Sequence, residues 1–275
     1  MKFLISNDDG VYAPGLLALY KELSKLGEVV VVAPSSEQSG SASSLHITQP
    51  LYTQKLTSGF IAVSGSPADC IYLALHQLYS DIQFDCVITG INSGANLGQD
   101  VLYSGTFGAA LTAQIFGIPA IATSLVSDSF TGNEQEGYYK IAAQQIAQLL
   151  AKTALLTEMK NLPYHVLNVN IPGVDKACDI KGHKITQLGH SLLARPVHQM
   201  VDPRGRTAYW LSLKKRQSPY VDDSKSSMTL IENDDNSDIV LTDDQAVAAG
   251  YISLSPVRLH HTPVSTLERF STLKL

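Results

Sequence analysis

Short apolar segments alternate with amphipathic segments over the first part of the chain. Residues 3–5 are a short apolar run, and residues 28–34 are a valine-rich run of the kind found in strands buried on both faces of a sheet. Between them, residues 14–26 carry apolar side chains at helical spacing, with a proline in the first turn and Gly27 after the last turn. This region therefore predicts a strand, a helix and a second strand.

The alternation continues to about residue 171. Residues 45–63 predict extended chain with turns that can form a hairpin. The other predicted elements are helices at 67–79, 106–116 and 134–152 and strands at 84–91, 119–126 and 164–171. Alternating strands and helices favour a Rossmann-like α/β fold, in which helices cover both faces of a doubly wound, mainly parallel sheet.

The pattern changes after Pro172, where polar loops separate short strand-like pieces. The segments are strand-like at 184–188 and 207–213, strongly polar at 216–238, helical at 243–249 and apolar at 251–254. We therefore predict a core over residues 1–175 and a C-terminal α+β extension over residues 176–275.

Composition and charge narrow the classes of partner. The hydrophobic fraction of 44% and charged fraction of 16% are ordinary for a globular protein. A net charge of -5 gives no general attraction to a nucleic acid polymer or to an anionic membrane. No apolar stretch reaches the length of a membrane span. The three cysteines lack CxxC spacing, which fits a reducing compartment, so we expect a cytoplasmic protein.

Four polar segments follow or adjoin predicted strands. They are residues 7–10 (Asn-Asp-Asp-Gly), 37–41 (Glu-Gln-Ser-Gly-Ser), 90–96 and 103–106 (Tyr-Ser-Gly-Thr). Ligands of such sheets bind beyond the carboxyl ends of the strands, so the four segments are expected to meet at one edge. Taken singly, Asp-Asp-Gly is typical of a turn and Ser-Gly-Thr of a helix start.

The chemistry of these segments is complementary. Carboxylates, an amide oxygen and a hydroxyl are the hard ligands that Mg²⁺ or Mn²⁺ prefers. A Ser-Gly-Thr turn that opens a helix offers hydroxyls and backbone N–H groups to a phosphate. A metal ion beside an anion-binding pocket can hydrolyse a phosphate ester, because the ion lowers the pKa of bound water and neutralises charge on the phosphoryl oxygens.

Several of these motifs resemble the SurE family of stationary-phase survival proteins. The likeness includes residues 7–10, 33–34, 38–40 and 64–70, and it is most specific in the long block at 89–106. Residues 203–206 and 250–256 also fit, whereas 217–238 match poorly. The resemblance implies a metal-dependent nucleotidase that hydrolyses nucleoside 5′- and 3′-monophosphates, and short-chain polyphosphate, by attack of metal-activated water.

The resemblance also implies a set of site residues. Asp8, Asp9, Ser39 and Asn92 would hold one divalent metal ion per subunit, Mg²⁺ or Mn²⁺. Asn96, Ser104, Gly105 and Thr106 would line the phosphate pocket. Asp8 and Asp9 are the candidate catalytic residues, and Asp8 is the better candidate for orienting the water. The C-terminal part of the family supplies arms exchanged between subunits, which implies a homodimer or homotetramer.

Two other functions stay open on the residues alone. A nucleoside N-ribohydrolase also clusters aspartates after its first strand, but it does not need the phosphate-binding turn at residues 104–106. A nucleotide-binding protein without turnover could share the fold. A covalent aspartyl-phosphate route is not expected, because Asp8 and Asp9 are adjacent and not spaced as Asp-x-Asp.

Overall fold

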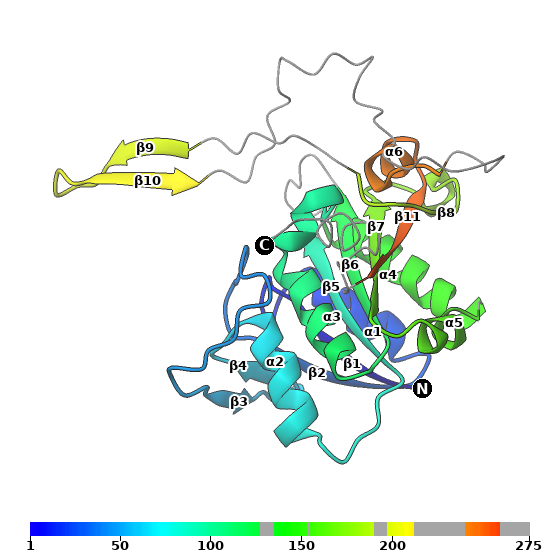
Figure 1. Cartoon of the computed structure of the whole chain (residues 1–275), viewed down its shortest axis with the longest axis horizontal. Helices are drawn as coiled ribbons and strands as arrows, with labels where there is room; N and C mark the ends of the chain where they lie inside the picture. The colour runs from blue at the N-terminus through cyan, green and yellow to red at the C-terminus, as the bar shows by residue number, and fades with distance from the viewer. Residues whose placement is uncertain (127–134, 153, 190–196, 212–239, 259–275) are drawn as a thin grey trace, which may run out of the picture. The chain divides into compact units, whose positions relative to one another are not determined.

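The computed structural model describes residues 1–126, 135–152, 154–189, 197–211 and 240–258 (Figure 1). The chain forms two compact units, which are described separately. The larger unit comprises Met1–Gly189 and Val240–Leu275, and the smaller one comprises His190–Ile239.

A nine-stranded sheet forms the centre of the larger unit, in the order β3-β4-β2-β1-β5-β6-β7-β11-β8. Its strands are β1 (Lys2–Ser6), β2 (Glu28–Pro34), β3 (Thr53–Lys55), β4 (Ile61–Val63), β5 (Cys86–Ser93), β6 (Ala120–Val126), β7 (His165–Pro172), β8 (His183–Ile185) and β11 (Ile252–Arg258). The pairs from β4 to β7 in this order are parallel. The predicted doubly wound, mainly parallel α/β fold is confirmed.

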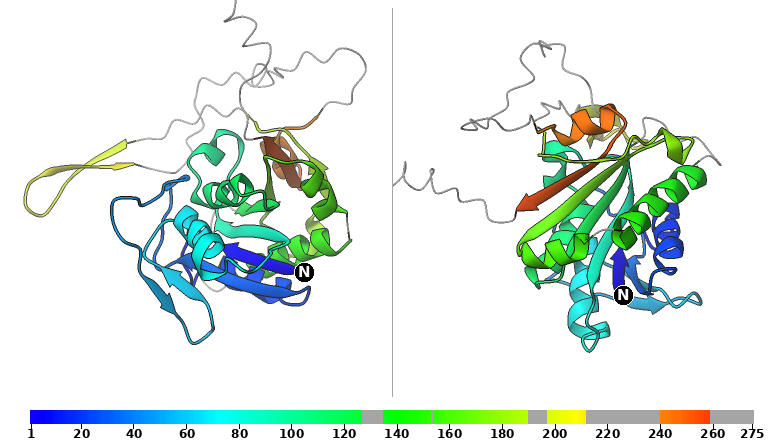
Figure 2. Two further views of the ribbon diagram at one scale, coloured as in Figure 1. Left: turned by 60° about the horizontal axis from the view of Figure 1, so that its bottom comes forward. Right: turned by 90° about the vertical axis from the view of Figure 1, so that its right-hand side faces the viewer.

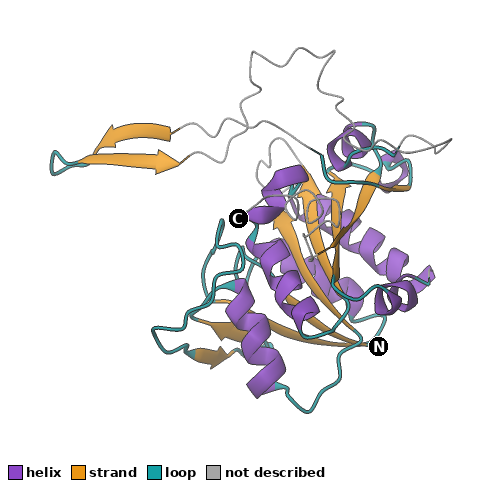
Figure 3. Ribbon diagram, in the orientation of Figure 1, coloured by secondary structure: helices purple, strands orange, loops and turns teal. Residues whose placement is uncertain are grey.

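Helices lie on both faces of this sheet (Figures 2 and 3). They are α1 (Pro14–Leu23), α2 (Pro67–Leu73), α3 (Gly105–Ile115), α4 (Gln135–Lys152), α5 (Leu155–Asn161) and α6 (Asp243–Ala248). Helix α1 packs beside α4, and α2 packs beside α3. A helix was predicted at 67–79. In the structure the α-helix ends at Leu73, and the chain continues as a π-helical turn over Ala74–Leu78.

The alternation of side chains along β1 shows how the sheet builds its two cores. Phe3 and Ile5 belong to the core that also contains residues of α1 and α4, whereas Leu4 belongs to the core shared with α2 and α3. All three side chains are completely buried. A strand with apolar residues on both faces must be central, since each face needs its own layer of helices.

The segment after residue 175 contributes to the same sheet. Strand β11 pairs antiparallel with β7, and β8 pairs parallel with β11. The predicted division near residue 175 therefore falls inside the larger unit, whose sheet is completed by β8 and β11. The predicted hairpin within 45–63 is present as the antiparallel pair β3 and β4.

The described part of the smaller unit is a two-stranded antiparallel hairpin. It comprises β9 (Val197–Val201) and β10 (Thr207–Leu211). Its turn is held by Asp202, whose side chain accepts hydrogen bonds from the backbone of Arg204 and from the backbone and guanidinium of Arg206. These donors lower the pKa of Asp202 below its usual value. The predicted polar stretch at 216–238 lies outside the described residues.

Within the described residues, no helix is both long enough and apolar enough to cross a membrane.

Candidate active site

Hydrogen bonds join the polar loops at the carboxyl ends of β1, β2 and β5 to the start of α3. The Gln38 amide donates to the carbonyl oxygen of Asp8 at 2.7 Å. The Ser93 amide donates to Asp9 Oδ2 at 3.1 Å, and the Thr106 hydroxyl donates to Asp8 Oδ1. The four segments selected from the sequence therefore meet at one edge of the sheet, as the rule for parallel sheets predicts.

Asp8 is a buried carboxylate, with only 4% of its surface exposed. Burial raises its pKa above the usual value, while hydrogen bonds from the side chain and backbone of Thr106 oppose that rise. Thr106 was expected to line a phosphate pocket, and the structure places its hydroxyl on Asp8. The contact fixes one oxygen of the Asp8 carboxylate at the first turn of α3.

Asp9 is less buried than Asp8 but is also strongly perturbed. Burial, followed by repulsion from the Asp8 charge, raises its pKa to about 6. The negative charge of Glu37 acts in the same direction on both aspartates. Neither aspartate forms a salt bridge with Lys, Arg or His within the part of the chain that the structure describes. Two neighbouring carboxylates without a cationic partner are suited to hold a metal cation.

Asn92 and Ser39 each retain an oxygen suited to a metal ion. The Asn92 Nδ2 donates to the Gly94 carbonyl at 2.9 Å, so Oδ1 is the remaining atom of that amide. Ser39 is exposed, and its hydroxyl donates to Glu37 Oε1 at 2.8 Å. The lone pairs of Ser39 Oγ are not used in that bond and can face a metal ion. Among the described residues there is no group of three His, Cys, Asp or Glu side chains that could hold a metal. Amide and hydroxyl oxygens would have to complete the ligand set.

The start of α3 supplies the candidate phosphate pocket. Ser104 caps the helix, because its Oγ accepts a hydrogen bond from the Phe107 amide at 3.0 Å. Gly105 lies directly against the aspartate loop. A Cβ atom at Gly105 would lie 2.9 Å from Asp8 Cβ and 2.6 Å from Ser41 Oγ. Glycine at this position therefore permits the close approach of the helix N-terminus to Asp8.

Asn96 is buried and is held mainly by β6 and β7. Its Nδ2 donates to Ser124 Oγ at 2.8 Å, and its backbone amide donates to Asn170 Oδ1 at 2.9 Å. The side chains of Asn168 and Asn170 both donate to its carbonyl oxygen. These bonds fasten the loop after β5 to the neighbouring strands, so Asn96 has a structural role in addition to the predicted phosphate contact.

Asp243 is a supporting residue that sequence reasoning missed. It is completely buried at the start of α6. Its two carboxylate oxygens accept hydrogen bonds from the backbone amides of Gly98 and Gly189, each at 2.8 Å. Burial raises its pKa, while these amides oppose the rise. The only sequence signal was a helix start, which does not reveal a partner 145 residues away.

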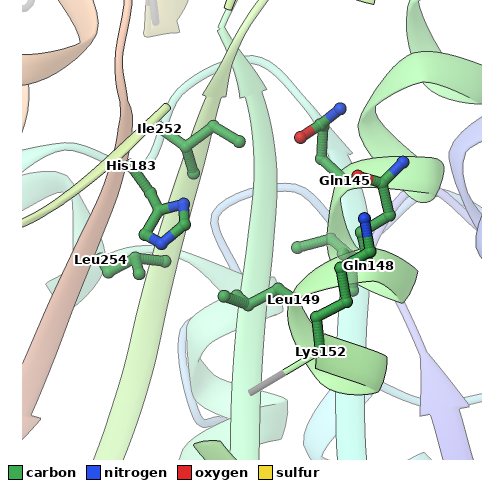
Figure 4. A pocket seen from close by; sticks show the side chains of 8 residues that line it. Gln145, Gln148, Leu149, Lys152, His183, Ile252 and Leu254 are labelled. Carbon is green, nitrogen blue, oxygen red and sulfur yellow. The ribbon is translucent and has the colours of Figure 1, made fainter. Parts of the chain in front are cut away.

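A hollow elsewhere in the larger unit contains none of these residues. It has a volume of about 250 Å³ and lies between α4 and the strands β8 and β11 (Figure 4). Its lining residues include Gln145, Gln148, Leu149, Lys152, His183, Ile252 and Leu254. The chemistry-bearing loops are therefore distinct from this hollow.

Comparison with known proteins assigns the family. The model of the family described as Survival protein SurE matches residues 3–195. The chain belongs to the SurE family. All eight residues that the resemblance implied for metal and phosphate lie within the matched range.

Individual SurE proteins match nearly the full length of the chain. The 5′-nucleotidase SurE of Psychrobacter cryohalolentis is 66% identical, with 100% of each chain covered. The 5′-nucleotidase SurE of Acinetobacter baylyi is 41% identical, with 99% of each chain covered. The crystal structure of the SurE protein from Aquifex aeolicus superposes with a TM-score of 0.73 at 33% identity and covers 98% of each chain.

Proposed function

We propose that this SurE protein is a metal-dependent phosphomonoesterase that hydrolyses nucleoside 5′-monophosphates to nucleoside and phosphate. The proposal extends to nucleoside 3′-monophosphates and short-chain polyphosphate, because each presents a terminal phosphoryl group. Relatives that are 66% and 41% identical carry the name 5′-nucleotidase SurE. That name supports the 5′ activity.

One observation carries the proposal: two neighbouring carboxylates, which have no salt-bridge partner among the described residues, lie against the N-terminus of a helix. Asp8 and Asp9 share a loop, and the Asp8 side chain contacts Thr106 in the first turn of α3. A helix N-terminus attracts an anion, whereas a carboxylate pair attracts a cation. Both requirements are met together by a phosphate ester bound with a divalent metal ion.

The donor atoms fit Mg²⁺ or Mn²⁺, one ion per subunit. Asp8, Asp9, Ser39 and Asn92 would hold it through carboxylate, hydroxyl and amide oxygens, which are the ligands these ions prefer. The raised pKa of Asp9 supports the fit, because a cation would offset the repulsion from Asp8. When bound, the ion would lower the pKa of a water molecule and neutralise charge on the phosphoryl oxygens.

Residues of the chain would orient the water, accept its proton and bind the phosphoryl oxygens. Asp8 is proposed to orient the attacking water and to accept its proton as a general base. The water oxygen forms a bond to phosphorus as the bond to the ribose oxygen breaks, and solvent returns a proton to that oxygen. Ser104 and Gly105, at the N-terminus of α3, would hold the phosphoryl oxygens, with Asn96 and Thr106 at the margin of the pocket.

We further propose that the protein works as a homodimer or homotetramer. The hairpin of β9 and β10 exposes large apolar side chains, among them Trp210 at 67% and Leu211 at 72% exposure. A two-stranded hairpin is marginally stable without a covering layer. A second copy of the chain would provide that cover, and mass measurement by light scattering with and without Trp210→Ser tests the idea.

The decisive experiment is phosphate release from a panel of nucleoside 5′- and 3′-monophosphates and tripolyphosphate. Each substrate is tested after chelator treatment and after addition of Mg²⁺ or Mn²⁺. Metal-restored release of phosphate is expected, and Asp9→Asn should lose it while an exposed variant, Asp81→Asn, keeps it. Release of free base would support a nucleoside N-ribohydrolase. Metal-dependent binding without any product would support a nucleotide-binding protein.

A further inference from the structure

Ser41 carries a buried hydroxyl that the preceding account does not use. The residue lies in the loop after β2, and its Oγ has no hydrogen-bond partner among the described residues. A buried hydroxyl without a partner is costly, and such atoms in native proteins call for an explanation. The missing partner here is expected to be a molecule that enters the site.

The position of this hydroxyl indicates what that molecule is. A Cβ atom at Gly105 would lie 2.6 Å from Ser41 Oγ and 3.0 Å from Asp8 Oδ2. Ser41 Oγ therefore lies beside the first residue of α3, close to the Asp8 carboxylate. An acceptor that is drawn to a helix N-terminus is an anion, and a phosphoryl oxygen has the right chemistry.

The backbone around Ser41 holds the hydroxyl in place. The Ser41 amide donates to the Gln38 carbonyl at 3.2 Å, and the Ser41 carbonyl accepts from the Ser44 amide at 3.1 Å. The next residue, Ala42, has a φ of 51° and donates its amide to the Tyr103 carbonyl at 3.2 Å. A non-glycine residue at positive φ is strained, and such strain clusters at functional sites. The loop is thus anchored to the turn that precedes α3.

We propose that Ser41 Oγ donates a hydrogen bond to a phosphoryl oxygen of the substrate. This assignment rests on the proposed phosphomonoesterase function and adds a substrate-binding residue to it. A neutral donor is useful here because Asp8, Asp9 and Glu37 are all acidic, and Asp8 and Asp9 have no cationic side-chain partner among the described residues. The hydroxyl attracts the phosphoryl group without neutralising the aspartates.

The test measures binding of inorganic phosphate to Ser41→Ala, by calorimetry, with Mg²⁺ and with chelator. A hydrogen bond to a charged group is worth about a tenfold change in affinity or more, so the Kd for phosphate should rise by about tenfold. The matched control is Ser43→Ala, which removes an exposed hydroxyl from the same loop. Its Kd should equal that of the wild-type protein. A Ser41→Ala protein that binds phosphate within about twofold of wild type would overturn the proposal.

Thermal melting separates phosphate binding from a structural role. Without phosphate, Ser41→Ala should melt no lower than the wild-type protein, because Ser41 Oγ makes no hydrogen bond within the described residues. With phosphate, its melting temperature should rise less than that of wild type. A lower melting temperature without phosphate, combined with an unchanged phosphate response, would show that Ser41 is structural.

The outcome for Ser41 can be distinguished from the outcome for the proposed function. If the wild-type protein hydrolyses nucleotides and Ser41→Ala has unchanged KM and phosphate affinity, only the Ser41 assignment fails. If the wild-type protein hydrolyses nothing but binds phosphate in a Ser41-dependent way, the proposed function fails and the anion contact stands. If the wild-type protein does not bind phosphate under either condition, the Ser41 assignment is overturned.

Discussion

The substitution Asp9→Asn is expected to stabilise the metal-free protein while it removes activity. Burial and the neighbouring Asp8 charge raise the pKa of Asp9 from 3.8 to about 6. A carboxylate whose pKa is higher in the folded state destabilises that state once it is ionised. With each pKa unit worth about 1.4 kcal/mol, the difference corresponds to about 3 kcal/mol at neutral pH.

The pH dependence of this effect has a definite sign. Between the unfolded pKa of 3.8 and the folded pKa of about 6, the folded state binds more protons than the unfolded state. The contribution of Asp9 to the free energy of unfolding therefore falls as pH rises through that window and stays low above it. Below the window, Asp9 is protonated in both the folded and the unfolded state. Asp9→Asn then has no higher free energy of unfolding than the wild-type protein on account of this charge.

Urea unfolding of chelator-treated protein at pH 4 and pH 8 is the measurement. Asp9→Asn should exceed the wild-type free energy of unfolding by up to about 3 kcal/mol at pH 8 and by little at pH 4. Asp81→Asn, which alters an exposed carboxylate, should change neither value appreciably. Equal or lower stability of Asp9→Asn at pH 8 would refute the argument that burial and the Asp8 charge together destabilise an ionised Asp9. Near-normal phosphate release by Asp9→Asn would refute the metal assignment.

Three further substitutions test the geometry of the site. Gly105→Ala introduces a Cβ atom 2.6 Å from Ser41 Oγ, so we expect a loss of about 1–3 kcal/mol in stability and a reduced kcat/KM. Unchanged kinetics would contradict the close packing of Gly105 against the aspartate loop. Asp243→Ala removes the acceptor of the Gly98 amide and should cost about 1–3 kcal/mol in urea unfolding, with faster proteolysis of the loop after β5 as a second readout. Ser104→Ala removes the cap of α3 and should lower stability by about 1 kcal/mol in thermal melting, whereas full stability would show that the cap is dispensable.

Local patterns were sufficient to predict the elements near the site. The apolar run at residues 3–5 predicted a strand, and Phe3, Leu4 and Ile5 are buried in the two cores on opposite faces of the sheet. The helix predicted at 106–116 is observed at Gly105–Ile115. These predictions succeed because burial on both faces and helical periodicity are properties of consecutive residues. The meeting of the loops at one edge then follows from parallel strand order.

Long-range pairing could not be predicted in the same way. A strand-like segment was predicted at 184–188, and β8 is observed at His183–Ile185, but its three exposed residues carry no pattern that identifies β11 as its partner. Strand β11 was expected to belong to an extension, but it pairs with β7 through a register that joins Ser253 to Asn170. No local pattern specifies a partner that is more than 80 residues away. The boundary proposed near residue 175 reflected the change in local pattern and not the sheet.

The roles of individual site residues show the same limit. Ser-Gly-Thr at the start of a helix fits a phosphate pocket, and spacing alone gives no reason to place the Thr106 hydroxyl on Asp8. The contact gives Thr106 a role besides the predicted phosphate contact, because a hydroxyl that donates to a carboxylate orients that carboxylate. Thr106→Val should therefore alter the pH dependence of turnover more than the KM for substrate, if Asp8 accepts the proton.

The C-terminal segment is part of the machinery that positions the site. Asp243 binds the backbone amide of Gly98, at the end of the loop that carries Asn96 and follows Asn92 near the end of β5. Asn170, which pairs with β11 through its backbone, holds the amide of Asn96 through its side chain. The loop after β5 is thus fastened by residues that β7 and α6 supply. A deletion that removes α6 and β11 should consequently weaken metal and phosphate binding, although neither element carries a proposed ligand.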